Sequence, residues 1–296
     1  MRTPIALSGR SRVALPSQTY GCLAARADAL AIHFDLGLLA YDEGDSSGLQ
    51  RHIAAVAMLP EGGEKSPEFL ALKWRGRWLD GARDEALSVA QTAMKLHPDD
   101  VEATIEVAEI LAELGGLQTA AQLLLEAAGR HRDDPDLWYE TGLLFERLQE
   151  WTLRQQCWEQ VWALESDAEP QFPMWVSEAR FAEVAALAIE ALPSHVQSAL
   201  GNVVIFAEEY PERWVLETEG ADPRMLGLFD GIERSAERAT GVTQGGPSRI
   251  YLYRWNIERL CSDAAQVEHQ IAVTVQHEIG HYLGLDEAEL HLRGLG

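Results

Sequence analysis

The sequence predicts a two-domain protein, in which an all-α array of helical hairpins precedes a small α+β domain. Three observations indicate this multidomain fold class. Small residues recur at a fixed spacing in the first half, and two prolines interrupt the chain near residue 170. The second half then alternates short β-branched segments with helical patterns and ends in one long amphipathic helix. A length of 296 residues suits two domains of about 100–200 residues each.

The composition is that of a folded, strongly acidic protein. Hydrophobic residues make up 47% of the chain and charged residues 24%, which is enough to bury a core, and the formal net charge is −23. An acidic surface repels phosphate groups, so we expect no nucleic-acid partner and no binding to anionic membranes. The three cysteines are widely separated, which excludes a disulfide framework. No stretch is apolar enough to span a membrane, and we expect a cytoplasmic protein.

The chain begins with a basic segment whose apolar run is too short for a signal peptide, so residues 1–25 are expected to form a poorly ordered leader. A repeat follows over residues 26–168. Small residues recur 34 positions apart, and the matched pairs are Ala86 and Ala120, Ala93 and Ala127, and Ala108 and Gly142. Together with Trp138 and Phe145 they resemble the tetratricopeptide repeat, in which small residues let antiparallel helices pack closely.

This resemblance implies helical hairpins in three registers, roughly 67–100, 101–134 and 135–168, with a weaker fourth before them that contains Ala40. Trp74 departs from the pattern because it stands where a small residue is expected. Such arrays usually present a concave surface to a peptide or protein, so a protein partner is expected here. The four tryptophans of the third register either line that surface or pack between repeats, and packing is the commoner role; they are Trp138, Trp151, Trp158 and Trp162.

The composition changes at residues 169–175, which are expected to form a linker, and the second domain is expected over residues 176–296. A helix is expected from Val176 to Leu192, ended by Pro193. Strands are expected at 202–206 and 249–254, with a short third at 225–229, and a Gly-rich loop at 240–248.

A long helix is expected over residues 264–283. Asp263 is suited to cap its start, and Gln266 lies at the spacing of a capping box. Apolar residues at every fourth position predict one buried stripe, formed by Val267, Ile271 and Val275. Gly284 follows the helix and can adopt the positive φ that a helix stop requires.

The end of that helix carries an HExxH motif. His277 and His281 are four residues apart and share a helical face, so both imidazoles are expected to bind one Zn²⁺. Glu278 lies about 100° around the helix and is expected to act as general base toward a zinc-activated water. The motif therefore predicts a zinc metallopeptidase that hydrolyses amide bonds.

A catalytic zinc needs a third protein ligand and one open position. In HExxHxxGxxH proteases a glycine turns the chain so that the last residue of the motif reaches the metal, and Gly284 matches that glycine. Glu287 takes the last position and is the preferred third ligand, with Asp286 as the alternative. A contribution from His291, or no third protein ligand, also stays open.

Residues from about Phe181 to His291 resemble the minimal zincin-like metallopeptidases, a small bacterial domain. The resemblance rests on the HExxHxxGxx[DE] motif together with the residues at 192–193, 202–205, 226–231 and 249–254. It implies a compact zincin-like fold with a small mixed sheet packed on the active-site helix. It also implies zinc as the cofactor and a peptide as the substrate.

Two functions from different classes remain open. The first is a zinc metallopeptidase whose repeats recruit a protein substrate or regulator, which the intact Glu278 favours. The second is a tetratricopeptide adaptor with a zinc-binding domain of weak or lost activity, favoured by the short tail after Glu287 and the lack of an obvious oxyanion donor. Tyr251, Tyr253 and Tyr282 are candidate donors, although such tyrosines more often pack. The sequence does not predict an oligomeric state.

Overall fold

The computed structural model describes residues 29–198, 200, 203–231, 248–285 and 289. The expected leader, and the Gly-rich loop up to residue 247, lie outside these ranges. The described chain forms two compact units, one ending at Leu164 and the other beginning at Glu165. The linker expected at 169–175 and the domain limits beside it stay a prediction. No helix of the described residues is both long enough and apolar enough to cross a bilayer.

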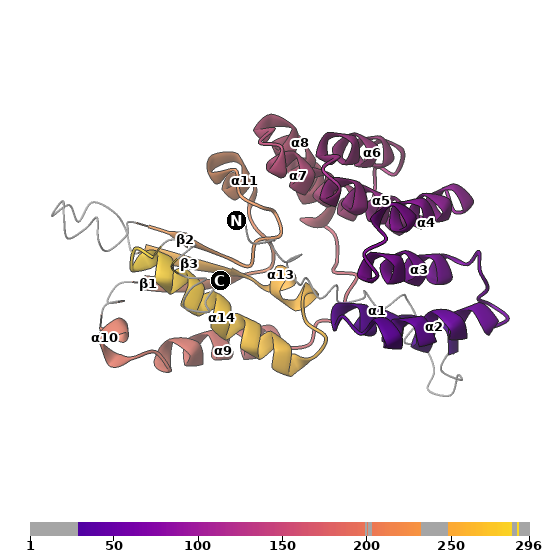
Figure 1. The fold of residues 1–296 in the computed structure, drawn as a ribbon. Helices are drawn as coiled ribbons and strands as arrows, with labels where there is room; N and C mark the ends of the chain where they lie inside the picture. Colours follow the sequence, from indigo (N-terminus) through magenta and orange to yellow (C-terminus); the bar gives the residue numbers. More distant parts are fainter. Residues whose placement is uncertain (1–28, 199, 201–202, 232–247, 286–288, 290–296) are drawn as a thin grey trace. The chain divides into compact units, whose positions relative to one another are not determined.

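The first unit consists of helices in consecutive pairs (Figure 1). They are α1 (Ala29–Asp42), α2 (Ser46–Met58), α3 (Pro67–Leu79), α4 (Arg83–Leu96), α5 (Val101–Glu113), α6 (Leu117–Arg130), α7 (Pro135–Arg147) and α8 (Trp151–Glu165). The first helices of three successive pairs begin at Pro67, Val101 and Pro135, which reproduces the 34-residue period of the sequence. The all-α repeat class is therefore confirmed, and α1 and α2 form the weaker fourth pair.

Local sequence explains where these helices begin and why they pack closely. Ser66, Asp100 and Asp134 cap α3, α5 and α7, each accepting a backbone N–H of the first turn. The small positions of the repeat are buried, with Ala86 and Ala120 fully inaccessible. At Gly142 an added Cβ would lie 2.5 Å from Trp158 Nε1, so only glycine permits this approach of α7 and α8.

The tryptophans divide between core and surface. Trp158 is 2% exposed and belongs to the core, whereas Trp151 is 51% exposed. Trp74, at the position expected to be small, is also buried. Its Nε1 donates a hydrogen bond of 2.8 Å to Glu106, which also accepts one of 2.6 Å from Arg75. The repeat thus accommodates a large residue because a buried acid provides its indole N–H with a partner.

The second unit is α+β, as the sequence predicts. It contains α9 (Glu178–Glu190), α10 (Ser194–Gln197), β1 (Val203–Glu208), α11 (Arg213–Glu219), β2 (Gly227–Asp230), β3 (Ser248–Tyr253), α13 (Arg254–Arg259) and α14 (Ala264–Tyr282). The sheet has the order β1-β3-β2, with β1 parallel and β2 antiparallel to β3. It is the small mixed sheet that the family resemblance implies.

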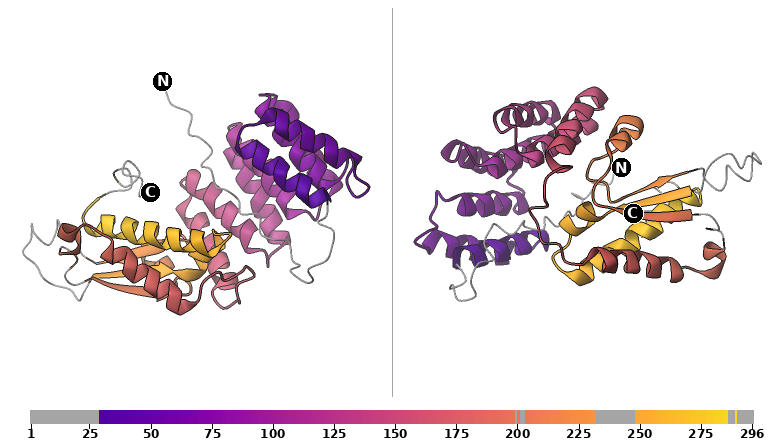
Figure 2. Two further views of the ribbon diagram at one scale, coloured as in Figure 1. Left: turned by 90° about the horizontal axis from the view of Figure 1, so that it is seen from below. Right: turned by 180° about the vertical axis from the view of Figure 1, so that it is seen from behind.

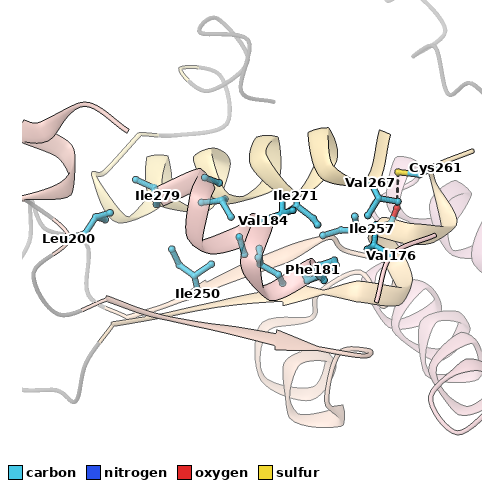
Figure 3. Packing of buried hydrophobic residues seen from close by; sticks show 14 of the residues in the cluster. Val176, Phe181, Val184, Leu200, Ile250, Ile257, Cys261, Val267, Ile271 and Ile279 are labelled. Carbon is cyan, nitrogen blue, oxygen red and sulfur yellow. Dashed lines mark hydrogen bonds between the residues drawn. The ribbon is translucent and has the colours of Figure 1, made fainter. Parts of the chain in front are cut away.

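The core of this unit lies between the sheet and two helices. Figures 1 and 2 show α9 and α14 side by side along the sheet. Ile250 and Leu252 alternate with outward residues of β3 and face these helices. Figure 3 shows the cluster that results, in which Phe181 of α9 packs among residues of α14. The apolar stripe of α14 is confirmed, since Val267, Ile271 and Val275 are fully inaccessible.

Several boundaries differ from the sequence prediction, and two of these differences have a clear local cause. The helix expected from Val176 begins at Glu178, because Ser177 caps it by accepting the Arg180 N–H. Arg254, expected to end a strand, instead begins α13, where its guanidinium donates to the Val176 carbonyl and to Glu258. The sequence does not predict the short helices α10, α11 and α13.

Candidate metal centre

The HExxH motif occupies the last turns of α14, a helix that is fixed at both ends. At its start, Asp263 accepts the Gln266 N–H at 2.8 Å, and the Gln266 side chain accepts the N–H of Ser262 at 3.0 Å. At its end Gly284 has a φ of 85°. The Gly284 and Leu285 N–H groups donate to carbonyls of the last turn, which is the Schellman pattern.

The two histidines of the motif converge. The Nε2 atoms of His277 and His281 lie 3.0 Å apart, and their ring centroids lie 4.7 Å apart with the rings nearly perpendicular. The Nδ1 atom of His281 lies 3.2 Å from the carbonyl oxygen of Leu285. A carbonyl can only accept, so this Nδ1 carries the proton and Nε2 presents a lone pair. That is the tautomer in which an imidazole binds a metal through Nε2.

The pair fits a zinc ion by its spacing and its chemistry. Nitrogen ligands at about 2.0–2.1 Å from a tetrahedral zinc lie about 3.3 Å from each other, close to the observed separation. Both residues are half-buried, so water has access to them. Within the described residues no group of three or more His, Cys, Asp or Glu side chains is arranged to hold a metal. Asp286, Glu287 and His291 lie outside those residues, and the third ligand stays a prediction.

Glu278 occupies the interface between α14 and the sheet. Glu278 is only 6% exposed, and its side chain faces Gly227, the first residue of β2. A Cβ added at Gly227 would lie 2.8 Å from Glu278 Oε1 and 2.9 Å from Thr274 Cγ2. The missing side chain of Gly227 therefore leaves the space that the carboxylate occupies.

Gly227 is the site residue that sequence reasoning missed. The available signal was a glycine within a short apolar strand, which often marks the close approach of another group. The position of Gly227 is set by the segment that precedes it. Asn256 Nδ2 holds that segment by donating to the carbonyls of Pro223 and Met225 at 3.0 and 2.8 Å. The Tyr253 N–H donates to the carbonyl of Leu226 at 2.9 Å. These bonds attach the start of β2 to β3 and α13.

The three candidate tyrosines are buried or stacked on another ring. Tyr282 is 6% exposed and packs edge-to-face with Phe229, with ring centroids 5.6 Å apart. Tyr253 is 1% exposed, and burial raises its pKa, with further increases from the charges of Tyr251 and Glu278. Tyr251 stacks on Phe206 and lies on the other face of the sheet from Ile250 and Leu252.

The thiols of the described residues belong to the core. Cys261 donates to the Ile257 carbonyl at 3.3 Å (Figure 3), and burial raises its pKa to about 11. Burial likewise raises the pKa of Cys157 to about 12. Neither thiol is poised to ionise at neutral pH, as a metal ligand must.

Comparison with known proteins agrees with this architecture. A family described as zincin-like metallopeptidase matches residues 200–295, and one described as tetratricopeptide repeat matches residues 78–139. The predicted fusion of tetratricopeptide repeats with a zincin-like domain is confirmed, and the HExxH motif lies inside the zincin-like match.

Two solved structures show a weaker likeness. The structure titled "MamA 41-end from Desulfovibrio magneticus RS-1" is 14% identical, with a TM-score of 0.35, and the match covers 59% of this chain and 90% of that one. "Crystal structure of MamA protein" has the same identity and TM-score and covers 59% and 87%. The search of curated proteins finds no match.

Proposed function

We propose that the second unit is a zinc-dependent metallopeptidase. His277 and His281 are the proposed histidine ligands, Glu287 the third ligand with Asp286 as its alternative, and Glu278 the general base. The observation that carries the proposal is the 3.0 Å approach of the two Nε2 atoms, next to a buried carboxylate on the residue after the first histidine. Zinc, when bound, supplies a water of lowered pKa at neutral pH.

Glu278 accepts a proton at a carboxylate oxygen and passes it to the leaving amine. Its place between α14 and β2 limits the rotamers that the side chain can adopt, because Gly227 and Thr274 lie against it. A base held in one position avoids part of the reorganisation cost of the reaction.

His281 contributes through its tautomer as well as its position. The hydrogen bond from Nδ1 to the Leu285 carbonyl directs its lone pair toward His277 and increases the basicity of the ring. This bond depends on the Gly284 turn, which brings the Leu285 carbonyl back to the last turn of the helix. The helix stop is therefore part of the proposed site.

We further propose that the repeats bind a protein or peptide and recruit it to the peptidase, in the cytoplasm. The family description of residues 78–139 supports a role in protein interaction. The alternative is an adaptor in which the zincin-like unit binds zinc without effective catalysis. The intact Glu278 and the space for it at Gly227 favour the enzyme.

Zinc analysis combined with cleavage of a peptide library tests this function. Wild-type protein is compared with Glu278→Ala and with Glu190→Gln, which changes an exposed acid at the end of α9. All three are expected to hold zinc, and Glu278→Ala is expected to lose about 10²–10⁴-fold in kcat/KM. Zinc in every protein with cleavage in none supports the adaptor. Failure of the wild type to hold zinc after reconstitution contradicts both functions.

A further inference from the structure

The first unit contains a second pair of converging imidazoles. His33 lies on α1 and His52 on α2, and their Nδ1 atoms are 3.1 Å apart. The ring centroids are 5.4 Å apart, and the rings are tilted by 45°. Both residues are half-buried. Neither stands at a small-residue position of the repeat, and the proposed peptidase chemistry uses neither.

The two helices hold this pair in a fixed arrangement. Asp45 caps α2 by accepting the Gly48 N–H at 2.9 Å. The core beneath the hairpin includes Leu49 and Val56, both fully inaccessible. At Gly37 an added Cβ would lie 2.7 Å from a methyl of Leu72, so α1 is also closely packed against α3. Two ligands presented by a packed hairpin need little reordering to bind a common ion.

The spacing of the pair matches that of two ligands on one cation. With metal–nitrogen distances of about 2.0–2.1 Å, atoms 3.1 Å apart subtend an angle of about 100° at the metal. This value lies between the angles of square-planar and tetrahedral coordination. The charges that act on His52 are those of His33, Arg51 and Asp45, and of these only Asp45 favours a cation, whereas the chain as a whole carries −23. The overall field therefore attracts cations.

We propose that His33 and His52 form a second metal site, which binds a divalent transition cation of the kind that prefers imidazole, such as Zn²⁺, Ni²⁺ or Cu²⁺. The protein supplies two nitrogen ligands and water completes the coordination. A cation bound there links α1 to α2 and stabilises the first hairpin of the repeats, because the unfolded chain does not hold the two rings together. The site lies outside the proposed peptidase unit and does not depend on its activity.

Calorimetric titration of the full-length protein with Zn²⁺ tests the proposal. The wild type is expected to bind two equivalents, and His33→Ala/His52→Ala is expected to lose one. His277→Ala/His281→Ala should lose the other and retain the equivalent at the hairpin. The matched control is His195→Ala/His269→Ala, which removes two exposed imidazoles and should bind as the wild type does.

The single variants His33→Gln and His52→Gln guard against misfolding of the double variant, and each is expected to lose the same equivalent with an unchanged far-ultraviolet dichroism spectrum. An unchanged stoichiometry in His33→Ala/His52→Ala overturns the proposal. So does a wild type that binds a single equivalent removed by His277→Ala/His281→Ala. Failure of the peptidase proposal is distinct, since it appears as zinc binding that His277→Ala/His281→Ala does not change.

Discussion

Each of the two units brings a pair of imidazole nitrogens together, and the pairs differ in what surrounds them. The His277–His281 nitrogens are 3.0 Å apart and the His33–His52 nitrogens 3.1 Å. Glu278 follows the first histidine of one pair, whereas Phe34 and Ile53 follow the two members of the other. Only the first pair also has a carbonyl that fixes a ring tautomer among the contacts described above.

This difference in surroundings distinguishes a site that only binds a metal from a site that also catalyses a reaction. Two converging nitrogens are sufficient to attract a transition cation, and both units provide them. Amide hydrolysis also needs a base near the metal, and that base must be held in place. In the second unit this requirement is met by Glu278 and by the space at Gly227. In the first unit no residue adjacent in sequence to His33 or His52 carries a carboxylate, so we expect metal binding alone.

The largest effect is expected for a variant that lowers the stability of the first unit and leaves the second unit unchanged. Arg75→Met leaves the carboxylate of Glu106 buried without its cation, since the two side chains are 10% and 3% exposed. Loss of one partner of a buried ion pair destabilises a protein by about 3–5 kcal/mol. Urea denaturation monitored by circular dichroism should therefore show a repeat unit of reduced stability.

The matched control for Arg75→Met is Arg213→Met, which removes a cation from an exposed pair with Glu217 and should change little. In the Arg75 variant the zinc equivalent at His277 and His281 is expected to persist. Equal stability of the two variants would show that the Arg75–Glu106 pair does not support the repeat unit.

An intermediate effect is expected at Gly227. In Gly227→Ala the new Cβ meets Glu278 Oε1 and Thr274 Cγ2, so the carboxylate must move. Displacement of a catalytic group by about 1 Å can cost about 10²-fold in rate, and we expect a fall of that order in kcat/KM with zinc content unchanged. Gly129→Ala is the control, because a Cβ there meets nothing within 4 Å.

A second readout keeps the role of Gly227 testable if the enzyme proves inactive. A crystal structure of Gly227→Ala should show the Glu278 side chain in a new rotamer. An unchanged rotamer, with the strand moved instead, would mean that Gly227 does not determine where the carboxylate lies.

The smallest effect concerns pH. The hydrogen bond from Arg180 of α9 lowers the pKa of Glu268 on α14 below its ordinary value of 4.5. A pKa that is lower in the folded than in the unfolded chain adds stability above the ordinary value and loses it as pH falls through the folded value. Glu268→Gln should therefore reduce the Tm at neutral pH slightly and flatten its decline below pH 4.5.

Thermal unfolding of the wild type and Glu268→Gln, followed from neutral pH to below 4.5, measures this effect. Glu190→Gln serves as the control because it changes an exposed acid of the same helix pair. Parallel Tm curves for wild type and Glu268→Gln would contradict the assignment of the Arg180 contact.

The sequence predicts those features that depend on local spacing. The repeat period, the Asp263 cap of α14 and the four-residue separation of His277 and His281 can each be read along one chain segment. The Gly227–Glu278 approach and the His33–His52 pair are not, because they join residues 51 and 19 positions apart and depend on how elements pack. The burial of Trp74 cannot be predicted from its own segment either, since it depends on Glu106 of another helix.

Diffraction from crystals of the zinc-loaded protein at the zinc absorption edge locates the metal and so tests the proposed metallopeptidase. We expect an anomalous peak bound by the Nε2 atoms of His277 and His281 and by one carboxylate oxygen, from Glu287 or from Asp286. We also expect a second peak between His33 and His52. The absence of zinc from His277 and His281 in fully loaded crystals would contradict the proposed metallopeptidase.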